Sequence, residues 1–216
     1  MIDLHTHTFF SDGELVPAEL VRRAAVAGYR AIAITDHADK SNIGWLLANI
    51  VGVVNEFGDA NGMQVLAGVE LTHVAPAGIA DAAKLARDQG AELVVVHGET
   101  IVEPVMPGTN LAAIKAGVDI LSHPGLITPE EVQLAAEMGV CLEITTRKGH
   151  SLTNGHVAKL ARKYGARLVI NNDAHGPGDL VSAEQMRRIA LGAAMTEEQI
   201  LQARDNSRAL VERAKG

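Results

Sequence analysis

The sequence has little of what several functional classes of protein require. Its 216 residues include one cysteine, one tryptophan, two tyrosines and three phenylalanines. A single thiol, Cys141, excludes a disulfide within the chain, and its place between Val140 and Leu142 predicts a core thiol in a strand. Aromatic residues make up only 3% of the sequence, too few for the base-stacking platform of a protein that binds single-stranded nucleic acid.

Positive charge and long apolar runs are also scarce. The formal net charge is -7 and the pI is about 5.7, whereas a surface for nucleic acid or membranes would show a basic stripe. No apolar run approaches the length of a membrane-spanning helix, and residues 1–5 lack the cationic start of a signal peptide. We therefore expect a cytoplasmic protein that binds neither membranes nor nucleic acids in general.

The sequence does contain enough apolar material for a complete core. Hydrophobic residues make up 47% of the chain, and a chain of this length can bury its core as one domain. No internal repeat or linker divides it. We expect a single domain over residues 1–216.

Short runs rich in Val, Ile and Leu recur along the chain without polar alternation. Such runs are typical of parallel strands that are buried on both faces. Helical patterns lie between most of them, and several begin at a proline or a capping box and end at a glycine. The predicted strands are 1–4, 30–35, 64–70, 92–97, 118–122, 139–144 and 166–172, and the predicted helices are 17–27, 82–89, 129–138, 157–164, 182–193 and 196–213.

A strand followed by a helix, repeated seven times, predicts an α/β parallel barrel of the TIM-like (β/α)7 type. Right-handed crossovers would bring the carboxyl ends of all strands to one rim. Six of the nine histidines lie at or just past these strand ends, accompanied by carboxylates. The residues expected on the rim are His5, His7, Asp12, His37, Glu70, His97, His123, Asp173 and His175.

Each of these residues by itself has an ordinary explanation. One histidine at a strand end is more often a polar core residue with a partner than a metal ligand, and Asp12 next to Gly13 would suit a turn. Six such histidines are difficult to explain as independent accidents, because a buried imidazole without a partner carries a desolvation cost. The pattern as a whole therefore predicts a metal cluster.

Imidazole and carboxylate ligands without thiolates suit Zn, Mn or Fe, and the sequence leaves the choice among them open. Three carboxylate ligands against up to six positive charges would leave a cationic pocket that attracts an anion. Metal ions about 3.5 to 4 Å apart can lower the pKa of a shared water and clamp phosphate oxygens. The cluster therefore favours hydrolysis of a phosphoester by a metal-bridging hydroxide.

Taken in order, the motifs resemble those of the PHP (polymerase and histidinol phosphatase) superfamily. The similarity covers essentially the whole chain and rests on His5-x-His7, Thr35-Asp36-His37, Gly68-Val69-Glu70, His97-Gly98, Ser122-His123-Pro124 and Asn172-Asp173-Ala174-His175. The resemblance implies a distorted seven-stranded barrel with three metal ions, and a stand-alone phosphoesterase like the histidinol phosphatases. Its substrate would be a small phosphomonoester of histidinol-phosphate or nucleotide type.

The resemblance also implies which residue holds which metal. The first ion would bind His5, His7, Glu70 and Asp173, the second Glu70, His97 and His123, and the third Asp12, His37 and His175. Glu70 would bridge the first two ions, and Glu70, Asp173 and His175 are the residues expected to act in catalysis. Position 12 is a histidine in some members, so the aspartate here implies a harder third site.

Substrate contacts are expected after the sixth strand, where Arg147, Lys148 and His150 follow one another closely. A guanidinium there would deliver a bidentate fork to the rim, although a solvated loop charge is the simpler explanation, above all for Lys148. Glu143 is expected to accept a hydrogen bond from a metal-bound imidazole. Residues 98–110 form a long segment rich in Pro and Gly that we expect to cover the site.

Three other functions stay open at this point. The first is an amidohydrolase-type metal enzyme, which also begins with His-x-His but normally has an eighth strand and often a bridging modified lysine, neither of which is found here. The second is a nuclease acting on DNA ends, which the acidic surface disfavours. The third is a non-catalytic regulatory module, which the intact ligand set disfavours. The oligomeric state is left open.

Overall fold

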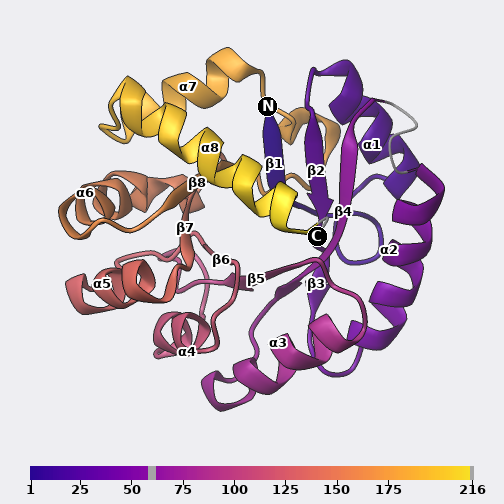
Figure 1. Cartoon of the computed structure of the whole chain (residues 1–216), viewed down its shortest axis with the longest axis horizontal. Helices are drawn as coiled ribbons and strands as arrows, with labels where there is room; N and C mark the ends of the chain where they lie inside the picture. The colour runs from indigo at the N-terminus through magenta and orange to yellow at the C-terminus, as the bar shows by residue number, and fades with distance from the viewer. Residues whose placement is uncertain (58–61, 215–216) are drawn as a thin grey trace.

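The computed structural model describes residues 1–57 and 62–214. Its strands form one parallel sheet in the order β1-β2-β4-β5-β6-β7-β8, and the short β3 pairs with β4 (Figure 1). The strands are β1 (Ile2–Thr6), β2 (Ala31–Ile34), β3 (His37–Ala38), β4 (Gln64–Leu71), β5 (Leu93–His97), β6 (Ile120–Ser122), β7 (Cys141–Thr145) and β8 (Leu168–Asn171). The predicted seven-stranded TIM-like barrel is confirmed, with β3 as an addition.

Eight helices surround the sheet in the described part of the chain, and six of them correspond to predicted helices. They are α1 (Pro17–Val26), α2 (Ile43–Phe57), α3 (Ile79–Asp88), α4 (Thr109–Lys115), α5 (Pro129–Met138), α6 (Asn154–Tyr164), α7 (Ala183–Gly192) and α8 (Glu197–Ala214). Helix α2 escaped prediction because its sequence, IGWLLANIVGVVNEF, has almost no charged residues to mark a polar face. Helix α4 is short and begins inside the segment that was predicted to be a loop.

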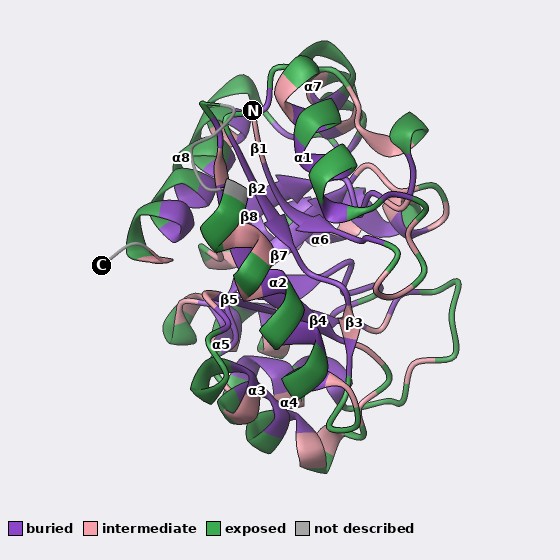
Figure 2. Cartoon of the chain, turned by 90° about the vertical axis from the view of Figure 1, so that its right-hand side faces the viewer, coloured by how far each residue is buried: buried purple, intermediate pink, exposed green. Residues whose placement is uncertain are grey.

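The barrel buries two separate apolar layers. One lies between the strands and the surrounding helices, whose outer faces are exposed (Figure 2). The other fills the inside of the barrel with Leu4, Ala31, Ala33, Leu66, Leu93, Val95, Ile120, Cys141 and Val169, to which α8 adds Leu210 and Val211. Helix α8 crosses β8 and β1 (Figure 1) and contributes these two side chains to the inner layer. None of the helices within residues 1–57 and 62–214 has both the length and the apolar character needed to cross a bilayer.

The seam between β1 and β8 closes the barrel mainly through side chains. One parallel bridge joins Thr6 to Ala174, just beyond the end of β8. Below it, Asn171 Oδ1 accepts a hydrogen bond from the Leu4 backbone N–H at 3.0 Å. Asp3 accepts two more from Asn172, at 3.1 Å from the backbone N–H and 2.7 Å from Nδ2. Asp3 is fully buried. These side-chain hydrogen bonds take the place of the backbone hydrogen bonds that a regular pair of strands would form between β1 and β8.

We expect Asp3→Ala to destabilise the metal-free protein by about 2–4 kcal/mol, because it leaves buried N–H donors of Asn172 without an acceptor. Chemical denaturation in the presence of chelator measures the free energy of unfolding. Asp88→Ala is the matched control, because Asp88 pairs with Lys84 on an exposed surface and should change stability by less than about 0.5 kcal/mol. Equal effects of the two substitutions would show that Asp3 does not hold the seam.

Candidate metal centre

All nine predicted ligands lie at the carboxyl ends of the strands, on one rim of the barrel. His5 is the last residue but one of β1, His97 is the last residue of β5, and His123 follows β6 directly. Asp173 and His175 follow β8, and Glu70 lies near the end of β4. Strand β3 matters here because its pairing with β4 sets His37 opposite Glu70.

Glu70 lies at the centre of this rim and is fully buried. Its Oε1 lies 3.1 Å from His5 Nε2, and its Oε2 lies 2.8 Å from His37 Nδ1. Two hydroxyl groups fix the carboxylate, since Ser122 Oγ donates to Oε1 at 2.7 Å and Thr72 Oγ1 lies 3.2 Å from Oε2. Each oxygen therefore faces a different group of imidazoles.

Four ligand groups lie at and around Glu70, and within each group the potential ligand atoms lie within 4.8 Å of one another. The first is made of His5, His7 and Glu70, and the fourth of His5, His123 and Asp173. The second is made of His97, His123 and His150. The third is made of His7, Asp12, His37 and His175. His5, His7 and His123 each belong to two groups, which joins the four groups into one centre.

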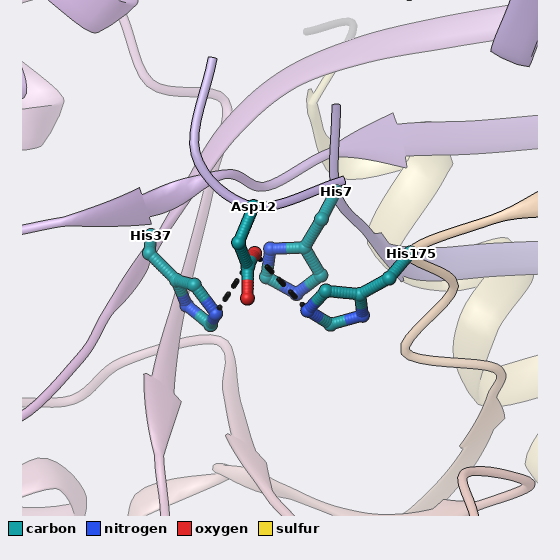
Figure 3. A group of neighbouring side chains, drawn as sticks. All are labelled: His7, Asp12, His37 and His175. Atoms are coloured by element: carbon teal, nitrogen blue, oxygen red, sulfur yellow. Dashed lines mark ion pairs between the residues drawn. The ribbon is translucent and has the colours of Figure 1, made fainter. Parts of the chain in front are cut away.

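In the third group, Asp12 lies between His37 and His175, with His7 beside them (Figure 3). Asp12 Oδ1 lies 3.4 Å from His37 Nε2 and 3.2 Å from His175 Nε2, and the Asp12 side chain is 58% exposed. The His7 ring lies next to both imidazoles, with ring centroids 4.2 Å away in each case. An ion bound here would therefore be the most accessible to solvent.

Most of the predicted ligand histidines use Nδ1 to fix the ring and direct Nε2 into the centre. Glu143 Oε2 lies 2.8 Å from His5 Nδ1, which confirms the predicted role of Glu143 as an imidazole partner. The backbone carbonyl of Gly98 lies 3.2 Å from His97 Nδ1, and that of Asp173 lies 3.0 Å from His175 Nδ1. Such partners select the tautomer in which Nε2 can bind a metal.

Several polar atoms of the centre are buried without a hydrogen-bond partner among the described residues. They are both ring nitrogens of His7, His123 Nδ1, Glu143 Oε1 and His5 Nε2, whose 3.1 Å approach to Glu70 Oε1 lacks the geometry of a hydrogen bond. A buried polar atom that lacks a partner costs about 1–3 kcal/mol, so a group of them in one place needs an explanation. Metal ions coordinated by the imidazole nitrogens would supply it. The donor set thus fits bound metal.

The charges of the centre favour an ionised carboxylate at Glu70. Burial by itself would raise the pKa of Glu70, but the positive charges of His5 and His97 hold it well below its usual value. Burial by itself would lower the pKa of His5, but the negative charges of Glu143 and Glu70 raise it well above its usual value. Cationic imidazole thus balances the buried carboxylates when no metal ion does so.

Two other histidines are neutral in the same surroundings. Burial lowers the pKa of His7 and of His123 well below the usual value, and neighbouring imidazoles act in the same direction. Burial raises the pKa of Asp173 to about 7. A neutral imidazole is the form that coordinates a metal, so His7 and His123 need lose no proton to do so.

The backbone is strained at two of the predicted ligands. His123 has φ 25° and Asp173 has φ 53°, a region that costs a residue with a side chain about 1–3 kcal/mol. Next to them, Gly98 lets two strand ends approach closely, because a Cβ atom there would lie 2.3 Å from the Ser122 carbonyl oxygen. The glycine thereby allows His97 and His123 to meet.

The predicted substrate contacts lie in different environments. Arg147 is partly buried, and its Nη1 lies 3.0 Å from Asp179 Oδ2, which also accepts hydrogen bonds from the backbone N–H groups of His175 and Gly176. Lys148 is exposed. His150 is buried at the start of the 3-10 helix η2 (His150–Thr153), against His97 and His123.

Sequence reasoning missed three residues that touch the centre. Thr72 and Ser122 hold Glu70, and Ser122 could have been noticed because it directly precedes His123. Glu103 comes from the long segment that was predicted to cover the site, and its carboxylate lies 3.1 Å from His97 Nε2. The covering role of that segment agrees with this contact, but nothing in the sequence singled out Glu103 within it.

Comparison with known proteins adds independent observations. Residues 3–99 match the model of the PHP domain. A protein of Methanocaldococcus jannaschii described as uncharacterised is 50% identical over 200 residues, which are 92% of each chain. A probable phosphatase of Shewanella sp. (strain ANA-3) is 32% identical, over 81% of this chain and 76% of the relative.

A solved structure shares the fold at low sequence identity. The histidinol phosphate phosphatase of Lactococcus lactis, complexed with zinc, L-histidinol and phosphate, superposes with a TM-score of 0.65 at 16% identity. The match covers 90% of this chain and 94% of that one. At this identity the likeness concerns the fold of the barrel.

Proposed function

Because this chain belongs to the PHP domain family, we propose that it is a metal-dependent phosphoesterase that hydrolyses a small phosphomonoester at a centre of three metal ions. The observation that carries the proposal is the set of imidazoles and carboxylates around Glu70, in which several buried nitrogens have no hydrogen-bond partner among the described residues. The Shewanella relative's description as a probable phosphatase and the phosphate in the Lactococcus lactis structure support it.

The ligand groups divide among the ions as follows. His5, His7, Glu70 and Asp173 would hold the first ion, Glu70, His97 and His123 the second, and Asp12, His37 and His175 the third. Bound divalent ions would polarise a phosphoryl group and lower the pKa of a water molecule toward neutrality. Zn, Mn and Fe all suit these ligands.

The protein's own groups prepare the site for this chemistry. Ser122 and Thr72 hold the two oxygens of Glu70 in different directions, so that one carboxylate can serve two ions. Glu143 fixes the His5 ring, and the apolar interior of the barrel closes the centre from below. The exposed Asp12 marks the side from which substrate and water would enter.

Arg147 is our candidate for phosphate recognition. Asp179 engages one nitrogen of the guanidinium, and the same Asp179 oxygen holds the backbone of His175. The guanidinium therefore lies beside the loop that carries a ligand of the third ion. A planar fork of five N–H donors can bind Asp179 and a phosphate together.

A substrate screen tests the proposed function directly. The metal-loaded protein is assayed against histidinol phosphate, generic phosphomonoesters, nucleotides, single-stranded DNA and a small amide, with the chelator-treated protein as control. We expect turnover of a phosphomonoester that disappears with the metal. Turnover of the amide alone would indicate an amidohydrolase, cleavage of DNA alone a nuclease, and no turnover with full metal content a regulatory module.

Metal content is the first measurable consequence. Elemental analysis of protein purified without chelator should find close to three transition-metal ions per chain, because the nine proposed ligands form three sets. Fewer than two ions per folded chain would exclude a centre of three metals.

The bridging role of Glu70 predicts an unequal pair of variants. Glu70→Gln should lower both metal content and kcat/KM, the latter by roughly 100-fold or more, because it removes a charge that serves two ions. Asp12→Asn alters a half-exposed ligand of one ion and should have a clearly smaller effect. Elemental analysis and steady-state kinetics compare the two, and equal mild effects would contradict the bridge.

Arg147→Ala should raise KM and leave the metal content unchanged. A charge-assisted bidentate contact contributes about 2–3 kcal/mol, so kcat/KM should fall roughly 30- to 150-fold, and Arg147→Lys should recover only part of the loss. Asp179→Ala is the matched variant. It frees the His175 backbone while the guanidinium stays, so it should lower the metal content. If Arg147→Ala instead lost metal as Asp179→Ala does, Arg147 would position the loop and would not bind phosphate.

A further inference from the structure

His150 does not have the surroundings of a substrate-binding side chain. Its side chain is only 8% exposed, and its ring stacks on that of His123 with centroids 4.2 Å apart and an interplanar angle of 19°. The ring of His97 lies edge-on to it, with centroids 5.9 Å apart. His150 is therefore packed within the centre, beside two histidines that are proposed to hold the second ion.

The orientation of the His150 ring follows the pattern of the other ligand histidines. Thr100 Oγ1 lies 2.8 Å from His150 Nδ1, as Thr72 Oγ1 lies 2.7 Å from His37 Nδ1. Because the Thr100 hydroxyl engages Nδ1 of His150, Nε2 of this ring is directed toward the centre. His156, two turns further along the chain, shows the opposite arrangement, because its Nε2 hydrogen-bonds the Ile127 carbonyl at 2.8 Å.

The distances suit a shared ion. Ligand atoms of His97, His123 and His150 lie within 4.8 Å of one another. Bonds of about 2.0–2.1 Å place two imidazole nitrogens of a tetrahedral site about 3.4 Å apart, so small side-chain movements would bring the three together.

A carboxylate from the covering loop reaches the same place. Glu103 Oε2 lies 3.1 Å from His97 Nε2, and Oε1 lies 3.4 Å from His150 Nε2. The Glu103 side chain is 38% exposed, so the carboxylate stands between the buried imidazoles and solvent. The Glu103 carboxylate thus faces His97 Nε2 and His150 Nε2, the ring nitrogens that are available to bind a metal ion.

We propose that His150 is a third imidazole ligand of the ion at His97 and His123, and that Glu103 completes this set from the loop. This inference rests on the proposed metal centre and deepens it. The second ion would then be held by Glu70 of β4 together with side chains from β5, the end of β6, η2 and the covering loop. Binding of that ion would fasten the loop over the site.

Metal affinity tests the proposal without any assay of catalysis. The full-length protein and its variants are loaded with Zn(II), and a chromophoric chelator then competes for the ions one by one. We expect His150→Ala to weaken one ion by about 100-fold or more, and Glu103→Gln and Thr100→Val to weaken the same ion by about 10-fold or more. His156→Ala is the matched control and should leave all affinities unchanged.

A spectroscopic measurement identifies coordination directly. The visible absorption of the Co(II)-loaded protein should change in position or intensity in His150→Ala and stay the same in His156→Ala. Thermal denaturation of the metal-free variants shows whether His150→Ala still folds. If it does not, the milder Thr100→Val and Glu103→Gln variants carry the test.

The outcomes separate this inference from the proposed function. Wild-type affinities and an unchanged Co(II) spectrum in His150→Ala, with a raised KM, would overturn the proposal and restore the role of His150 as a substrate contact. A wild-type protein that binds no metal would instead overturn the proposed function itself.

Discussion

The whole rim depends on the burial of one carboxylate. An ionised Glu70 side chain without access to water would be very costly unless positive charge and hydrogen-bond donors surrounded it. Imidazoles from β1, β3 and β6 and a hydroxyl from Ser122 provide these partners. His5 comes from β1, His37 from β3, and Ser122 and His123 from the end of β6, so the parallel sheet brings these partners together from three strands. The same requirement explains β3, whose two residues serve to hold His37 opposite Glu70.

The barrel could be predicted from two features of the sequence, the buried strands and the polar residues that end them, because both are local. A buried strand is recognisable from a few adjacent residues, and the polar residue that ends it stands beside it, as His97 does after Val96. Parallel topology then requires those ends to meet, so nine side chains could be placed on one rim. Glu143 could be assigned a partner for the same reason, because its strand position directs it toward the centre. Helix α2 was missed because its almost uncharged sequence lacks the polar face that distinguishes a helix from a strand.

The contacts that escaped prediction join residues that are far apart in sequence or lie in irregular segments. Asp3 and Asn172 form the seam across 169 positions, and neither has a neighbour that suggests the other. Asp179 holds both Arg147 and the His175 backbone from a 3-10 turn whose sequence, Pro177–Asp179, is ordinary. Glu103 was one of two glutamates in a long loop. Side chains of this kind take their role from tertiary packing, which no local pattern expresses.

The seam also determines when the centre can exist during synthesis of the protein. His5 and His7 belong to the first strand, whereas Asp173 and His175 follow the last, and little regular backbone pairing joins the two strands. A ribosome produces the first pair of side chains long before the second, at about 5–20 residues per second. The proposed ligands His5 and His7 are therefore made before Asp173 and His175, and only a chain read through to His175 presents the complete proposed set. A full complement of metal ions at the proposed centre would then mark molecules whose synthesis had reached His175.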